Sequence, residues 1–141
     1  MDKTEARIRL AIDAMGSDLG PSEVLEGVAQ AIDRSPWNTE FVLFGQEEII
    51  EPLITSHSIL SRSKVEFVHS PEVVGMEEKP IAGIKGKKKS SMSLALEALK
   101  EGEADALLSC GNTGCLMAGG AIKLRTLDGV ERPALCTIWP G

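Results

Sequence analysis

The stretch ALLSCGNTG, residues 106–114, joins a short apolar run to a polar turn that contains two glycines. Residues 113–124 follow at once and are rich in Ala, Gly, Leu and Met, which predicts a helix able to pack closely on a sheet. A strand that leads through a tight turn into a helix is part of a βαβ unit. The stretch therefore favours an α/β fold with a mostly parallel sheet.

The rest of the chain repeats this alternation of apolar runs and helical patterns. Strands are expected at Ile8–Asp13, Phe41–Phe44, Val65–Val68 and Ala106–Ser109, with a fifth beginning near Ala134. Besides the helix at 113–124, helices are expected from Pro21 to about Ile32, from Ser90 or Ser91 to near Gly102, and more weakly from Gln46 to about Thr55. This order predicts helices on both faces of the sheet.

Residues 70–89 break the alternation, because they contain two prolines, three glycines and a run of lysines. We expect a long functional loop there. No repeat or interdomain linker is apparent, and the last predicted strand is cut short at Gly141. Residues 1–141 are therefore expected to be the N-terminal part of a single α/β catalytic domain whose remainder is absent.

Composition restricts the class of function. The chain has 43% hydrophobic and 26% charged residues, which favours a globular domain over disorder. A net charge of -6 argues against a general nucleic-acid binder. The three cysteines lack C-x-x-C spacing and the two histidines begin no ligand pattern, so neither a disulfide framework nor a metal site is expected. No apolar run or leader suggests export, so a cytoplasmic location is expected.

The first candidate turn, residues 13–21, follows the carboxyl end of the first strand, where open α/β sheets place their ligands. Gly16 and Gly20 allow a tight turn with a close backbone approach, and Gly16 and Ser17 are candidates to bind the substrate or phosphate. Asp13 and Asp18 are candidates to orient a substrate or hold a lysine. The alternative is an ordinary strand-to-helix turn with a capping aspartate.

The second candidate turn holds Ser109, Gly111, Asn112, Thr113 and Gly114. Amide groups at a helix start carry partial positive charge, and small residues leave room for phosphate oxygens. The hydroxyl and amide side chains would add neutral donors. The turn therefore predicts an anion site, although a capped βα turn remains an alternative.

The third candidate is KGKKKSS, residues 85–91, where lysines precede two hydroxyls and a helix start. Lys87, Lys88, Ser90 and Ser91 are the candidates for phosphate or an acidic partner. The spacing is not that of a Walker A loop, and no G-x-G-x-x-G supports dinucleotide binding. A solvated charge run is the alternative.

Several of these motifs, in this order, resemble one family. AIDAMGSDLGP, EFVLFG, residues 78–80, KGKKKSSMSLALEALKEGEADALLSCGNTG and residues 129–135 are similar to the phosphate acyltransferases of bacterial phospholipid synthesis. The resemblance covers essentially the whole chain. Three positions depart from the family pattern: Ser17 replaces a glycine, Gly86 a basic residue and Cys110 an alanine. The alanine in the family argues against Cys110 as an acyl-accepting nucleophile.

The resemblance implies a Rossmann-like fold similar to the phosphotransacetylase and isocitrate dehydrogenase class. It also implies transfer of a long-chain acyl group from acyl carrier protein to inorganic phosphate, giving acyl phosphate, with no cofactor. Family members are longer than this chain and form homodimers, so the isolated piece is expected to be inactive. Peripheral association with the inner face of the membrane is a further expectation.

The resulting hypothesis places phosphate on the second turn. Ser109, Asn112, Thr113 and the backbone of Gly111 and Gly114 would hold it, Lys87 or Lys88 would neutralise it, and Asp13 and Asp18 would orient the loops. Two alternatives remain open. The lysines could form a docking surface for acyl carrier protein or an anionic membrane, with no catalytic role. The enzyme could instead resemble a phosphotransacetylase that uses coenzyme A thioesters.

Overall fold

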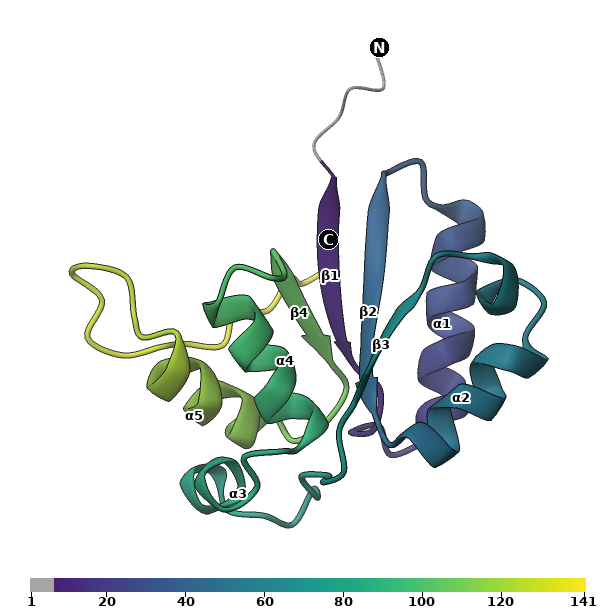
Figure 1. Ribbon diagram of the computed structural model, residues 1–141. Helices are drawn as coiled ribbons and strands as arrows, with labels where there is room; N and C mark the ends of the chain where they lie inside the picture. The colour runs from purple at the N-terminus through teal and green to yellow at the C-terminus, as the bar shows by residue number, and fades with distance from the viewer. Residues whose placement is uncertain (1–6) are drawn as a thin grey trace.

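The computed structural model describes residues 7–141 and contains a parallel four-stranded sheet of order β3-β2-β1-β4 (Figure 1). The elements are β1 Ile8–Asp13, α1 Pro21–Arg34, β2 Thr39–Gly45, α2 Glu47–Ser56, a 3-10 turn Leu60–Arg62, β3 Glu66–His69, α3 Pro80–Gly86, α4 Ser91–Lys100, β4 Ala106–Ser109 and α5 Thr113–Lys123. The α/β class and the parallel sheet are thereby confirmed.

Helices cover both faces of the sheet, as predicted (Figure 1). Successive strand residues point to opposite faces, so neighbouring residues of β1 enter different cores. Ile12 packs with α1 and α2, whereas Ala11 packs with α4. The α1–α2 core includes Leu25, Val28, Phe41, Leu43 and Ile50, and the α4 core includes Val42, Phe44, Ala95 and Ala98. Burying these side chains in two layers is the main source of stability.

The order in which strands are added to the sheet reverses at β1. From β1 the chain moves to β2 and then β3 on one side, and it returns to place β4 on the other side of β1. Open α/β sheets bind ligands at such a switch point, outside the carboxyl ends of the strands. The register pairs Asp13 with Ser109, so the β1–α1 turn (residues 13–20) and the β4–α5 turn (residues 109–114) leave the sheet side by side.

Residues 70–89 contain more regular structure than the sequence predicts. Helix α3 occupies Pro80–Gly86, and a parallel bridge joins Glu72 to Ser90. Pro80 at the first helical position favours the helix, and Ile84 is buried in a third core with Met92 and Leu96. Packing against α5 and α4 therefore stabilises a helix in this segment. Its proline and glycine content alone predicts a loop.

The predicted fifth strand near Ala134 is wrong for the structure described here. Residues 124–141 form turns and extended chain without a strand, and Leu135, Ile138 and Trp139 are 66%, 91% and 87% exposed. A β-branched or aromatic run forms a strand only when it pairs with a neighbour. Residues 134–141 do not pair with β4, so local sequence preference alone leaves them irregular.

Candidate functional site

Asp13 lies at the centre of the strand-end region and is 2% exposed. Its Oδ1 accepts hydrogen bonds from Ser91 Oγ at 2.6 Å and from the Met15 amide at 3.2 Å. Its Oδ2 accepts one from Ser109 Oγ at 2.7 Å. Asp13 therefore joins β1, the start of α4 and the end of β4 through one buried carboxyl group.

The two turns approach each other through glycines. A Cβ atom built on Gly16 would lie 2.8 Å from the Gly111 Cα atom and 2.8 Å from Asp13 Oδ2. Side chains larger than glycine cannot be accommodated at that separation without a shift of backbone. The Gly111 amide also donates to Ser109 Oγ at 3.1 Å. The sequence indicated a close approach of a ligand at Gly16, and in the structure the residue that lies close to Gly16 is Gly111 of the other turn.

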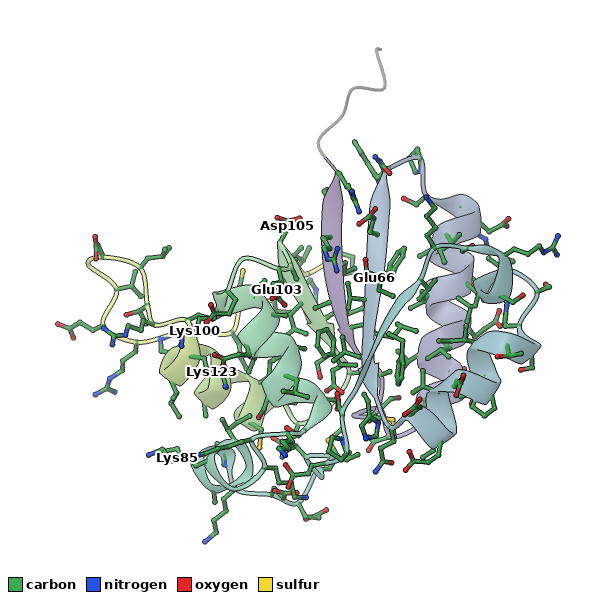
Figure 2. The ribbon with its side chains drawn as sticks, in the orientation of Figure 1. Glu66, Lys85, Lys100, Glu103, Asp105 and Lys123 are labelled. Atoms are coloured by element: carbon green, nitrogen blue, oxygen red, sulfur yellow. The ribbon has the colours of Figure 1, made fainter. Side chains whose placement is uncertain are left out.

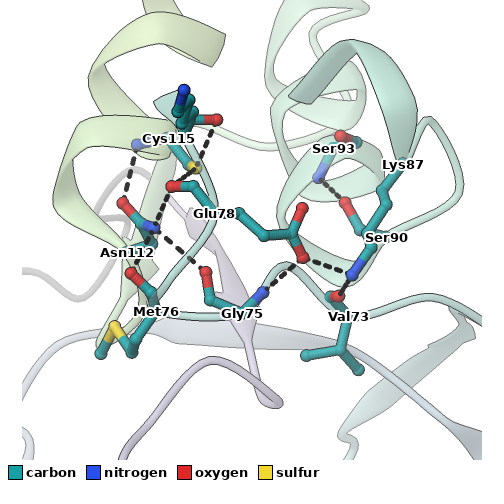
Figure 3. Close-up of polar contacts among 10 residues, drawn as sticks. Val73, Gly75, Met76, Glu78, Lys87, Ser90, Ser93, Asn112 and Cys115 are labelled. Atoms are coloured by element: carbon teal, nitrogen blue, oxygen red, sulfur yellow. Dashed lines mark hydrogen bonds and ion pairs between the residues drawn. The ribbon is translucent and has the colours of Figure 1, made fainter. Parts of the chain in front are cut away.

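Asn112 fastens a neighbouring loop to α5 (Figure 3). Its Oδ1 accepts from the Cys115 amide at 3.0 Å and so caps the helix. Its Nδ2 lies 3.1 Å, 3.0 Å and 3.0 Å from the carbonyl oxygens of Gly75, Met76 and Glu78. The side chain is 9% exposed and fully occupied, so its contribution to an anion site would be to position the turn.

Glu78 completes this loop from the other end (Figure 3). Its carboxylate accepts from the Gly75 amide at 2.9 Å and pairs with Lys87, whose Nζ also donates to the Val73 carbonyl at 2.7 Å. The Gly75 hydrogen bond and, secondarily, Lys87 lower the pKa of Glu78 below its usual value. Lys87, expected beside phosphate, is therefore held by the loop.

The side chains of the four predicted serines, one in each strand-end turn and two in the lysine segment, form hydrogen bonds within the protein. Ser90 is buried and caps α4 by accepting from the Ser93 amide at 3.2 Å, as predicted for a serine at this point. Ser91 and Ser109 each direct a hydroxyl hydrogen to Asp13. Ser17 Oγ accepts from the Leu19 amide at 3.2 Å. A hydroxyl has one hydrogen, so Ser91 and Ser109 can offer a ligand only acceptor capacity in this arrangement.

The donors left open at the β4–α5 turn belong to the backbone. Within residues 7–141, the amides of Thr113 and Gly114 at the start of α5 have no hydrogen-bond acceptor. The Thr113 side chain is exposed beside them. First-turn amides carry partial positive charge and point along the helix axis, which suits an anion. Asn112 supplies the cap on the Cys115 amide and leaves these two amides without an acceptor.

Lysines gather on the α3 side of this region. Lys85, Lys88 and Lys89 are exposed and form no ion pair with any residue of the described chain. Figure 2 shows Lys85 projecting from α3, whereas Glu103 and Asp105 lie toward the amino-terminal end of β4. Asp18 is exposed and, in residues 7–141, pairs with no lysine. The expected lysine–aspartate contact is thus absent from the described part.

Sequence reasoning gave Glu78 and Lys79 no individual role; they entered only through the family resemblance. Cys115 Sγ lies 3.7 Å from the Glu78 carbonyl and 3.8 Å from that of Lys79, which places both residues beside the start of α5. Burial, and then the nearby Glu78 carboxylate, raise the pKa of the Cys115 thiol. Cys115 is thereby a packing residue in its protonated form, and Cys110 is exposed.

Residues 7–141 contain no cluster of three histidine, cysteine, aspartate or glutamate side chains placed to hold a metal ion. No helix in the same range is both long and apolar enough to cross a membrane.

A family model described as "Fatty acid synthesis protein" matches residues 8–141. The chain belongs to the fatty acid synthesis protein family. The match runs through both strand-end turns and the lysine segment, so every candidate site residue lies inside the family region.

Individual relatives of this family carry a more specific description. The chain is 48% identical over 136 residues to a phosphate acyltransferase of Azorhizobium caulinodans, covering 96% of this chain and 38% of that protein. It is 47% identical over 136 residues to one of Rhodopseudomonas palustris, covering 95% and 38%, and 40% identical over 133 residues to one of Levilactobacillus brevis, covering 94% and 37%. The chain therefore spans well under half the length of these curated relatives.

Proposed function

We propose that the complete protein transfers a long-chain acyl group from the thioester of acyl carrier protein to inorganic phosphate, giving acyl phosphate. The observation that carries this proposal is the contact of the β1–α1 and β4–α5 turns through Gly16 and Gly111 at the switch point of the sheet. Open amides of Thr113 and Gly114 lie in the second turn. The names of the relatives supply the reaction class.

In this reaction a phosphate oxygen attacks the thioester carbonyl carbon, the carbon–sulfur bond breaks, and the phosphate proton ends on the departing thiol. Thioesters are activated, so holding phosphate against the carbonyl is the main requirement. Correct positioning of two reactants lowers a barrier by about 7 to 11 kcal/mol. The role of Asp13, Ser91 and Ser109 is then to hold the two turns in register. Asn112 holds the start of α5.

Neutralisation of phosphate is assigned to exposed lysines. Lys88 is exposed without an ion pair in the described chain, whereas Lys87 is held by Glu78. Lys88 is therefore the stronger of the two predicted candidates, with Lys87 positioning the loop. Asp18, which is exposed, remains a candidate for contact with substrate.

A substitution that removes one amide tests the phosphate assignment. Thr113→Pro deletes the N–H at the first helical position, where proline is tolerated, and Asn112 already has the extended conformation that precedes proline (φ -62°, ψ 106°). We expect the KM for phosphate of the full-length enzyme to rise about tenfold, the factor for one lost hydrogen bond to a charged group of about 1.5 kcal/mol. Thr113→Ala is the matched control for the hydroxyl. An unchanged KM in Thr113→Pro would remove phosphate from this turn.

A second candidate function is docking of an acidic partner on the lysines. The observation in its favour is that Lys85, Lys88 and Lys89 are exposed and unpaired in the described residues of an acidic chain. Replacing Lys88 and Lys89 with glutamine should then weaken binding of acyl carrier protein or anionic vesicles in a salt-dependent way, while turnover at saturating substrate survives. Loss of turnover at saturation would favour a catalytic role.

The thioester donor and the assembly belong to the same proposal. Side-by-side assays of acyl carrier protein and coenzyme A thioesters, following phosphate-dependent thiol release, distinguish an enzyme that uses acyl carrier protein from a phosphotransacetylase-like enzyme.

Residues 1–141 are proposed to be the N-terminal part of one catalytic domain, active only in the full-length homodimer. We propose that the enzyme is cytoplasmic and contacts the membrane peripherally. Acyl phosphate formation by the 141-residue piece would contradict the requirement for the full-length homodimer.

A further inference from the structure

The backbone of Lys79 lies against the first turn of α5. Its carbonyl oxygen is 3.8 Å from Cys115 Sγ. The residue before it reaches the same turn, because the Glu78 carbonyl oxygen accepts a hydrogen bond from Asn112 Nδ2 at 3.0 Å. Figure 3 shows Glu78 between Asn112 and Cys115 at this point. Contacts on two successive residues therefore fix this segment at the start of α5.

Pro80 holds Lys79 from the other side. A Cβ atom built on Gly114 would lie 2.9 Å from Pro80 Cγ, so the proline ring packs directly on the first turn of α5. Proline restricts the residue before it to extended backbone, and Lys79 has φ -67° and ψ 140°. Lys79 is therefore held beside Gly114, whose amide has no acceptor within residues 7–141.

The ammonium group of Lys79 is available to a ligand. Lys79 is exposed, and its side chain forms no ion pair with any residue between 7 and 141. It does not cap α3 either. A lysine side chain has a flexible four-carbon stem and three rotatable donors. From a backbone fixed beside α5, that stem is long enough to bring a positive charge to the open amides of the first turn.

Other lysines of residues 79–89 are bound or start from other places. Lys87 pairs with Glu78 and also donates to a backbone carbonyl. Lys85 is exposed and projects from α3 (Figure 2). The Lys89 amide donates to Glu72 Oε2 at 2.8 Å, where residues 72 and 90 form a bridge. Lys79 is thus the lysine of this segment whose position the start of α5 determines.

We propose that Lys79 binds and neutralises phosphate at the Thr113 and Gly114 amides, a role that the sequence hypothesis gave to Lys87 or Lys88. This inference rests on the proposed acyl transfer to phosphate and adds a residue to that site. The two amides supply only partial charges, so a full positive charge beside them strengthens anion binding. Negative charge moves from phosphate to the thioester carbonyl oxygen during attack. Lys79 therefore contributes to binding phosphate more than to the chemical step.

Lys79→Gln in the full-length enzyme tests this assignment. We expect the KM for phosphate to rise about tenfold, the factor for one lost hydrogen bond to a charged group, while kcat and the KM for the acyl thioester change little. Lys79→Arg keeps the charge and should recover most of the affinity. Lys64→Gln is the matched control, because it removes the same charge from an exposed lysine that precedes β3, at the opposite end of the sheet. It should keep the KM of the wild type.

Two results would overturn the proposal. One is an equal KM for phosphate in wild type and Lys79→Gln. The other is a raised KM that Lys79→Arg does not lower, since the positive charge would then not be the cause. A structural role alone would raise the KM for the acyl thioester by the same factor as that for phosphate, which also contradicts the proposal.

Failure of the proposed function gives a different pattern. If Thr113→Pro raises the KM for phosphate and Lys79→Gln does not, the inference on Lys79 fails and the phosphate site stands. If neither variant changes it, phosphate does not bind at this turn and both fail. If wild type releases no thiol from any acyl thioester, titration calorimetry with inorganic phosphate still tests the contact, because binding requires no turnover. Weaker phosphate binding by Lys79→Gln, with Lys64→Gln unchanged, supports the inference even then.

Discussion

Ser109 Oγ lies 2.7 Å from Oδ2 of Asp13, and the two residues are 96 positions apart in the chain. The contact joins the ends of β1 and β4 at the switch point of the sheet. With the matching contact from Ser91 Oγ, it means that a single buried carboxyl group holds three segments in place.

Asp13→Asn should destabilise the protein and remove acyl transfer. An amide can accept through one atom only, so one of the two serine hydroxyls loses its acceptor in a buried environment. We expect a loss of about 1 to 3 kcal/mol in the free energy of unfolding, measured by urea denaturation. Asp18→Asn is the control, since Asp18 is exposed and a surface change should stay within about 0.5 kcal/mol. Equal effects of both variants would contradict a structural role for Asp13.

Asn112 should be required for order in the loop at residues 75–78. Asn112→Ala removes the cap of α5 and the donor to three carbonyl oxygens, at a cost of about 2 kcal/mol or more. Asn112→Asp keeps the acceptor for the Cys115 amide but loses the donors. Hydrogen exchange should show loss of protection at the start of α5 only in Asn112→Ala, and at the Gly75 amide in both. Unchanged exchange at Gly75 would argue against the clamp.

Glu78 should make stability depend on acid pH. Its pKa in the folded protein lies below the ordinary 4.5 because of the Gly75 amide and Lys87. A lowered folded pKa stabilises the fold above the unfolded value, and this contribution is lost as pH falls through the folded value. Glu78→Gln should therefore lower stability at pH 7 and flatten the decline below pH 4.5, measured as urea midpoints against pH. Glu77→Gln, at an exposed position, should keep the decline of the wild type.

Adjacent glycines of α5 should respond in opposite ways to alanine. A Cβ on Gly119 would lie 2.5 Å from Leu96 Cδ1 and 3.1 Å from Ile84 Cδ1, so Gly119→Ala should cost about 1 to 3 kcal/mol by overpacking. Gly120 has open space, and Gly120→Ala should stabilise the helix by about 0.5 to 1 kcal/mol. Thermal unfolding of both variants measures the difference. Equal shifts would mean that α5 does not pack on α3 and α4 as described.

The lysine segment illustrates how far sequence reasoning reaches. Spacing and composition indicated a helix cap at Ser90 or Ser91, and Ser90 is the cap. The hypothesis named Lys87 or Lys88 as the group that neutralises phosphate, and in the structure Lys87 contacts Glu78, nine positions earlier. Neither Glu78 nor Val73 carries a local signal for that contact. The pairing depends on the path of residues 70–89, which the buried side of α3 sets.

By itself, the sequence determined the four strands, the helix starts at Pro21 and Thr113, and the position of the two turns that follow β1 and β4. These features follow from hydrophobic periodicity and from the placement of glycine and proline, which are local properties of the chain. Only the tertiary structure decided that Asp13 would bind Ser91 and Ser109, which takes their hydroxyl hydrogens away from a ligand. It also decided that the Thr113 and Gly114 amides stay open. A hydroxyl has one hydrogen, and which acceptor receives it depends on which residues the fold brings together.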